Sequence, residues 1–139
     1  MDFSEQIQEI TTHVNGITRQ AATKHNISFA QAQFLLSVPS EGISISELSN
    51  LIGIDISTMS RNVNKLEKLD LIYRELNVKD TRAHIIYLTS NGDDLLIELF
   101  KELDKCTSSV LSGLPIETLQ TTGDMLEQLN WALLKYHEK

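Results

Sequence analysis

The sequence is poor in features that would place it outside the cell or in a membrane. Its single cysteine, Cys106, cannot form a disulfide within the chain. No apolar run approaches the roughly 18 residues of a membrane-spanning helix. The first residues lack the basic start and apolar stretch of a signal peptide. We therefore expect a cytoplasmic protein without a membrane partner. Lys105 beside Cys106 favours the reactive thiolate, so oxidant sensing stays open beside the commoner role of a small buried hydrophobe.

Sequence patterns of enzymatic chemistry are also missing. The segment 42–46, Gly-Ile-Ser-Ile-Ser, lacks the second glycine of the G-x-S-x-G nucleophile motif. Neither a P-loop nor a G-x-G-x-x-G pattern is present. The four histidines do not have metal-binding spacing; they are His13, His25, His84 and His137. We therefore expect no enzyme, no metal site and no cofactor.

The charge of the chain is unevenly distributed along the sequence. The net charge of −7 by itself argues against a nucleic-acid partner, because phosphate binding requires cations. Between Ile56 and His84, however, six cations stand against four acids, whereas the remaining residues carry six cations and fifteen acids. An acidic body with a basic middle third is typical of a chain with one anion-binding face, although chance clustering would look the same.

The apolar periodicity predicts a mainly helical domain with two short strands. Apolar residues spaced by three and four indicate a first helix over 3–23 and a last one after Pro115. Four helices between them begin at the predicted N-caps Ser28, Ser44, Asp55 and Thr89. Branched and aromatic residues indicate strands at 71–76 and 83–88, joined by the polar loop 77–82. No linker or repeat divides the chain, so we expect a single domain over 1–139.

The third and fourth helices form a predicted helix-turn-helix, with Gly53 in the turn. Four residues of the fourth helix share one face and are expected in the core: Ile56, Met59, Val63 and Leu66. The opposite face has no acid and holds Ser57, Ser60, Arg61, Asn64, Lys65 and Lys68. Hydroxyl, amide and cationic groups contact phosphates and base edges in the major groove of DNA, so this face is a predicted DNA-binding surface. The alternative is an ordinary solvated helix.

The loop between the two strands is a predicted wing that contacts the minor groove. An arginine there, Arg82, is favoured by the negative potential of a narrow groove. Asp80, two residues earlier, would orient the Arg82 guanidinium by a charge-assisted hydrogen bond. Lys79 is expected to contact phosphate. The alternative is a routine polar hairpin tip.

Several segments of this sequence match short motifs of one known protein family. Asp80-Thr81-Arg82, Leu88-Thr89 and Gly92 match the pattern D-x-R-x5-L-T-x-x-G. The segments 48–55, 58–61 and 68–72 are similar to the motifs L-A-x-x-L-G-V-S, T-V-S-R and R-G-L-V. With these motifs, the sequence resembles the MarR family of winged helix-turn-helix transcriptional regulators. The match adds Thr58 to the expected DNA-contacting residues. Two departures are Asp70, where glycine is common, and Ser49, where alanine is usual.

The resemblance implies a fold, a partner and a ligand class. The fold is mainly α, with about six helices and a two-stranded β wing: a DNA-binding lobe over about 28–90, and dimerisation helices over 1–25 and 91–139. Apolar residues near both ends of the chain, such as Phe3 and Trp131, agree with a homodimer. The family commonly binds small aromatic ligands, for which the expected lining residues are His13, Ile17, Arg19, Phe34 and Tyr73.

Two functions therefore follow from the sequence. The first is a transcriptional regulator, in the simplest case a repressor, that binds a pseudo-palindromic operator in double-stranded DNA as a homodimer and is released by a small effector. The second is a winged-helix module that uses the same surface to bind another protein and no longer binds DNA. The negative net charge keeps the second alternative open.

Overall fold

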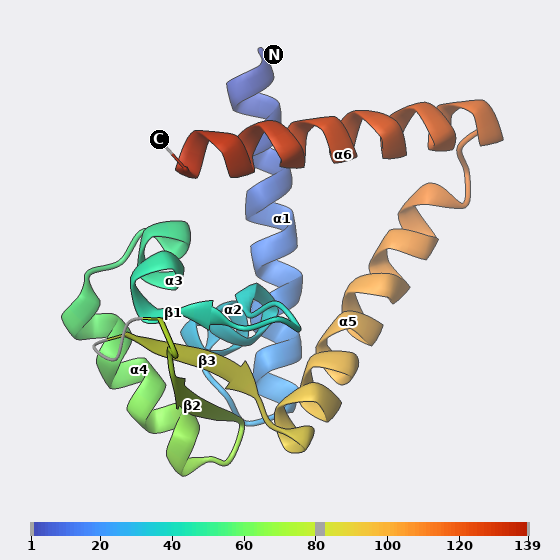
Figure 1. The fold of residues 1–139 in the computed structure, drawn as a ribbon. Coiled ribbons are helices and arrows are strands. Elements are labelled where there is room, and N and C mark those ends of the chain that lie inside the picture. The colour runs from blue at the N-terminus through green and yellow to red at the C-terminus, as the bar shows by residue number, and fades with distance from the viewer. Residues whose placement is uncertain (1, 80–82, 139) are drawn as a thin grey trace. The chain divides into compact units, whose positions relative to one another are not determined.

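The computed structural model describes residues 2–79 and 83–138, which fold into two compact units, Met1–Leu103 and Asp104–Lys139. The mainly helical winged-helix class expected from the sequence is confirmed (Figure 1). In chain order, the elements are α1 (Phe3–Lys24), α2 (Phe29–Ser37), β1 (Ile43–Ser44), α3 (Ile45–Ile52), α4 (Ile56–Lys68), β2 (Ile72–Leu76), β3 (His84–Leu88), α5 (Ser90–Leu111) and α6 (Ile116–His137). The division between the units falls within α5.

The N-caps predicted from the sequence are present in the structure. Ser28, Ser44, Asp55 and Thr89 each accept a hydrogen bond from the backbone N–H three residues later, at 2.8 to 3.1 Å. Each bond satisfies one of the donors that the first turn of a helix leaves without a partner. The helix starts in the lobe are thus fixed by local side chains.

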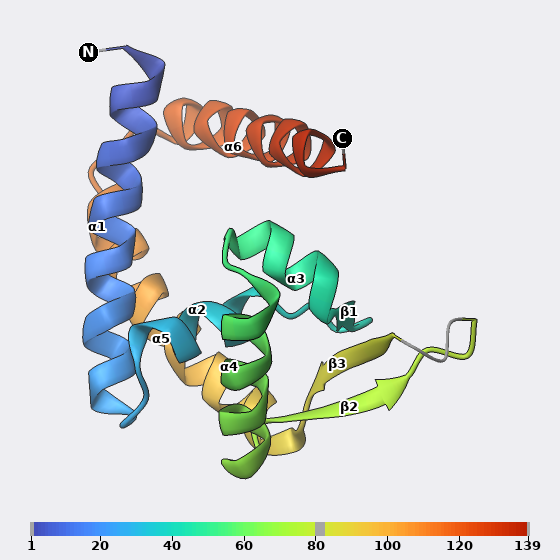
Figure 2. The same cartoon turned by 90° about the vertical axis from the view of Figure 1, so that its left-hand side faces the viewer.

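The sheet has three strands rather than the two that the sequence predicted. β2 and β3 form the antiparallel hairpin, in which Tyr73 lies opposite Tyr87, and β1 pairs with the other edge of β3. The prediction missed β1 because two residues are too short for an alternating pattern. Figure 2 shows the hairpin of β2 and β3 extending to one side of α3 and α4.

The core of the first unit lies where α2, α3, α4 and the sheet meet. Its largest fully buried side chains are Phe34, Leu35, Leu48, Met59, Leu66, Ile86, Leu99 and Val63. Three of the four residues expected on the inner face of α4 are among them. The fourth, Ile56, is 57% exposed, so its assignment to the core was wrong. Ile56 lies at the angle about the helix axis that faces the core. As the first residue of α4, however, it lies beyond the end of the core.

The connection from α4 to the sheet and into α5 is held by a close backbone approach. Asp70 has a φ of +57°, the left-handed conformation that aspartate tolerates better than most residues. The Thr89 hydroxyl donates to the Asp70 carbonyl at 2.6 Å, and the Thr89 N–H donates to the Leu71 carbonyl at 3.0 Å. A methyl group on Gly92 would lie 2.0 Å from the Leu71 oxygen. Only glycine therefore lets α5 start this close to the strand.

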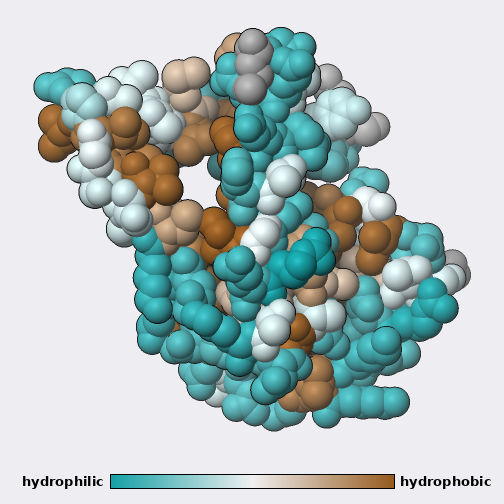
Figure 3. Space-filling view, turned by 180° about the vertical axis from the view of Figure 1, so that it is seen from behind, coloured by the Kyte–Doolittle hydropathy of each residue, from teal (hydrophilic) through white to brown (hydrophobic). Residues whose placement is uncertain are grey.

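The second unit consists of the end of α5 and α6. None of the 22 residues of α6 is buried within the single chain, although many are apolar. Trp131, for example, is 60% exposed. Hydrophobic side chains gather on the arm where α5 ends and α6 begins (upper left in Figure 3). No helix in the described part of the chain is long and apolar enough to cross a membrane.

Candidate nucleic-acid interface

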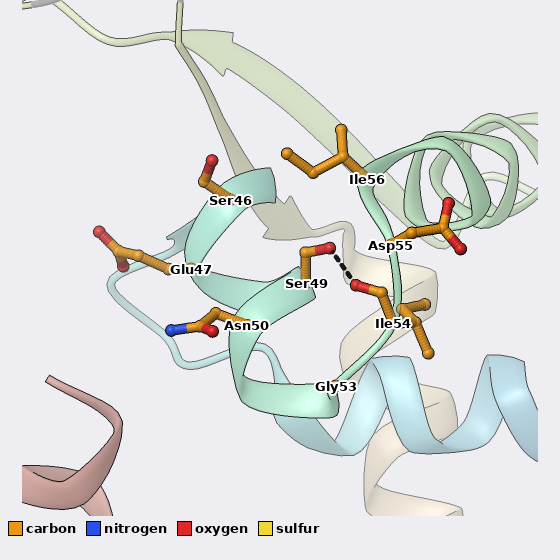
Figure 4. A pocket seen from close by; sticks show the side chains of 8 residues that line it. All are labelled: Ser46, Glu47, Ser49, Asn50, Gly53, Ile54, Asp55 and Ile56. Carbon is orange, nitrogen blue, oxygen red and sulfur yellow. Dashed lines mark hydrogen bonds between the residues drawn. The ribbon is translucent and has the colours of Figure 1, made fainter. Parts of the chain in front are cut away.

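The turn between α3 and α4 is closed by a reciprocal pair of hydrogen bonds, of which Figure 4 draws the one from the Ser49 hydroxyl. The hydroxyl of Ser49, which is buried, donates to the carbonyl of Ile54 at 2.6 Å. The Ile54 N–H donates back to the Ser49 carbonyl at 3.1 Å. Gly53 between them has a φ of +81°, which a residue with a side chain rarely adopts. These contacts fix the angle at which α4 leaves α3.

The first turn of α4 carries a short chain of polar side chains. Both Asp55 carboxylate oxygens accept from Thr58, one from its N–H at 2.8 Å and one from its hydroxyl at 2.7 Å. Arg61 donates to the Thr58 hydroxyl at 3.2 Å. The backbone N–H of Thr58 is the main cause that holds the pKa of Asp55 below its usual value, with smaller contributions from the Thr58 hydroxyl and the Arg61 charge. Asp55 therefore keeps its negative charge and holds Thr58 and Arg61 in order.

The middle of α4 is tied to the sheet by Arg74 of β2. Its guanidinium donates to the side-chain oxygen of Asn64 at 2.6 Å and pairs through Nε with the Glu67 carboxylate. A guanidinium has no acceptor, so this contact fixes the orientation of the Asn64 amide: the oxygen faces Arg74. Glu67, the acid at the flank of the surface, is neutralised by the same side chain.

The surface expected to contact DNA is present as one exposed face of α4. Ser57, Arg61, Asn64, Lys65 and Lys68 are exposed, and Ser60 and Thr58 are half-buried. These side chains come from consecutive turns of one regular helix. The structure therefore places all seven residues predicted on α4 along one side of it.

The wing is described only in part. The Asn77 N–H donates to the Ala83 carbonyl at 2.9 Å and closes the hairpin, and the Lys79 N–H donates to the Asn77 side chain at 3.0 Å. Lys79 is exposed. The predicted wing residues Asp80 and Arg82 lie outside the described residues, and their roles stay predictions.

Comparison with known proteins shows what this lobe is similar to. The family model described as MarR family matches residues 25–83. These residues, which cover most of the winged-helix lobe, are similar to that family. The fold of the whole chain is also that of a MepR mutant from a multidrug-resistant S. aureus clinical isolate, at a TM-score of 0.81 and 21% identity over 96% of this chain and 98% of that one.

Two further solved structures share the fold. Wild-type MarR from E. coli in the apo form has a TM-score of 0.76 and 17% identity, covering 93% of this chain and 96% of that one. A mutant of S. aureus MepR bound to an oligodeoxyribonucleotide has a TM-score of 0.63 and 22% identity, covering 96% and 99%.

Three further residues, which the sequence did not indicate as DNA contacts, lie beside the exposed face of α4. Ile56, Ser46 and His84 line a hollow of about 450 Å³ bounded by the starts of α3, α4 and β3. The exposed side chain of Ile56 is apolar, and apolar side chains contact the methyl groups of thymine in the major groove. Ser46, in the first turn of α3, offers a hydroxyl for a phosphate. The sequence feature that could have indicated the exposure of Ile56 is its position as the first residue of the helix.

The five residues expected around an effector lie in different surroundings. Phe34 is 1% exposed and belongs to the core, whereas His13 on α1 is exposed. The Arg19 guanidinium lies 4.4 Å from the centroid of the Phe29 ring. Tyr73 stacks on the ring of Tyr87, and Ile17 is half-buried on α1. Their joint role in ligand binding stays a prediction.

Proposed function

We propose that this chain is a DNA-binding transcriptional regulator. The observation that carries the proposal is the exposed, acid-free face of α4, next to a hollow lined by hydroxyls and flanked by the β hairpin. In this arrangement α4 enters the major groove as the recognition helix, and the hairpin follows the adjacent backbone. A protein of the same fold has been solved with an oligodeoxyribonucleotide, which supports DNA as the partner.

A homodimer is part of the proposal. Exposed apolar residues occur along α1 and throughout α6, among them Phe3, Ile10, Met125, Leu126, Trp131 and Leu134. Surface helices of a monomer normally bury one apolar face, and α6 buries none. A second copy supplies the missing surface, and its two-fold symmetry makes the operator pseudo-palindromic.

The proposed regulatory effect is repression, relieved by a small molecule. A dimer that covers two half-sites competes with other proteins for the same DNA. A ligand that binds the DNA-free state more tightly than the DNA-bound state shifts the protein off the operator.

DNA binding is tested by fluorescence anisotropy with duplexes from the DNA upstream of the chain's own coding sequence. Arg61→Ala should weaken specific binding by about 1–3 kcal/mol per half-site if Arg61 contacts a guanine edge. Lys65→Ala should weaken all duplexes alike and lower the salt slope by about 1. Lys101→Ala is the matched control, because it removes the same charge from α5, where Lys101 pairs with Glu98.

The outcomes separate the two functions. If Arg61→Ala and Lys65→Ala both bind DNA like wild type, as the control does, α4 does not contact DNA. If a folded dimer binds no duplex at low salt, the winged-helix lobe is a protein-binding module instead. Sedimentation equilibrium at micromolar concentration should give twice the chain mass, and a folded monomer there would contradict the dimer.

A further inference from the structure

A small pocket lies behind the sheet, on β2, β3, the start of α5 and the segment after α2. Its volume is about 310 Å³, at the lower end of the range for small-molecule sites. Two aromatic rings, Tyr73 and Tyr87, form part of its wall. Asp93 contributes the one charged side chain among the described lining residues, and Val38, Pro39 and Leu96 contribute apolar surface.

The aromatic wall is built rigidly. The two tyrosine rings stack with their centroids 5.4 Å apart and their planes 19° apart. Behind them Tyr87 rests directly on the backbone of Gly42, where a methyl group would lie 2.6 Å from the ring. Tyr73 remains 41% exposed, so the stack has one fixed end and one open end. Such a wall needs little ordering when a ligand binds, which lowers the entropic cost of binding.

The chemistry of the lining selects the charge of the ligand. Tyrosine rings attract cations to their faces, and a carboxylate supplies the matching negative charge. No lysine, arginine or histidine is among the described residues that line the pocket, so no positive charge there would pair with an anion. The apolar walls suit alkyl groups attached to the cation.

We infer that this pocket binds a small organic ammonium ion, with its alkyl groups against the tyrosine rings and its charge facing Asp93. The inference deepens the proposed function, because it assigns a location and a charge to the effector. It differs from the sequence expectation, in which a small aromatic ligand contacts Tyr73 together with residues of α1 and α2.

The pocket lies one residue away from the contact that holds the recognition helix. Successive side chains of a strand point to opposite faces of the sheet, so Tyr73 and Arg74 project to opposite sides of β2. Arg74 donates to Asn64 and pairs with Glu67, both on α4. A ligand that shifts Tyr73 therefore acts on the strand that positions α4.

The test uses choline and its uncharged isostere 3,3-dimethylbutan-1-ol, which have nearly the same shape. Binding to the full-length protein is measured by calorimetry and by NMR without DNA, so its result does not depend on whether the chain binds DNA. Choline should bind about tenfold more tightly than the alcohol, because only the cation gains from the rings and the carboxylate. Equal affinities, or no binding of either compound, would overturn the inference.

Variants locate the site. Tyr73→Leu and Asp93→Asn should each weaken choline binding about tenfold, and Tyr73→Phe, which keeps the ring, should retain it. Asp94→Asn is the matched control, since it makes the same change one residue away, at an exposed position that is not among the lining residues. Thermal unfolding of each variant shows that it is folded. Undiminished choline binding by folded Tyr73→Leu and Asp93→Asn would place the cation elsewhere and refute the assignment.

Discussion

Replacing Gly92 with alanine has two effects of opposite sign on the free energy of unfolding. Inside an ordinary helix, alanine is more favourable than glycine by up to about 1 kcal/mol. At position 92, however, the added carbon would lie 2.0 Å from the Leu71 oxygen, far inside van der Waals contact. The first turn of α5 would have to move away from the strand. That movement would break the two hydrogen bonds of Thr89, at 2.6 and 3.0 Å, to the carbonyls of Asp70 and Leu71.

The expected balance is a clear loss of stability. Overpacking costs about 1–3 kcal/mol, and each lost hydrogen bond adds about 0.5–1.5 kcal/mol. With two lost bonds, and after the propensity gain is subtracted, Gly92→Ala should lower the free energy of unfolding by about 1–5 kcal/mol. The measurement is urea unfolding followed by circular dichroism at a fixed chain concentration, because a dimer's stability depends on concentration.

Gly16→Ala is the control. It is the same substitution in α1, with nothing within 4 Å of the added carbon, and it should stabilise the protein by about 0.5–1 kcal/mol. If Gly92→Ala is as stable as wild type with an unchanged denaturant slope, the close approach of α5 to Leu71 is not a constraint, and the argument from its geometry fails.

Two further predictions concern the helix-turn-helix. Ser49→Ala should lower the free energy of unfolding by about 1 kcal/mol, because the Ile54 carbonyl loses its hydroxyl donor. Ser46→Ala, at an exposed position, is the control. Equal effects of the two substitutions would show that the hydrogen bond in the turn contributes nothing to stability. Asp55→Asn keeps a capping side chain but removes a charge whose folded-state pKa is lowered. The stability that wild type gains from this charge is present above the unfolded-state pKa of about 3.9 and is lost as the pH falls through the lower folded-state value. The difference between wild type and Asp55→Asn in urea unfolding should therefore shrink below about pH 4, and a difference that grows in acid would contradict the cause given for the shift.

The features that the sequence predicted correctly are those set by residues close together in the chain. A cap such as Ser28, for example, acts on an N–H only three residues away. The errors concern position in three dimensions. Periodicity gives the angle of Ile56 about the helix axis but not its distance from the core, and β1 is a strand only because β3 lies beside it.

The candidate site shows the same limit. The acid-free face of α4 follows from residue spacing, and the structure presents it as expected. The contact between Arg74 and Asn64 joins a strand to a helix ten residues earlier in the chain, and no local pattern indicates it. The tyrosine pocket likewise joins segments from residue 38 to residue 96.

Helix α6 has the apolar content of a core helix and, in one chain, no buried side chain. In the proposed dimer, the free energy that holds this helix comes from a second molecule and so depends on how many molecules are present. Each tenfold dilution of the chain removes about 1.4 kcal/mol from that stabilisation. The amount of protein then sets the fraction assembled to bind two half-sites, and chains made in small numbers expose an apolar helix to proteases. A regulator built this way responds to its own abundance before any ligand is present.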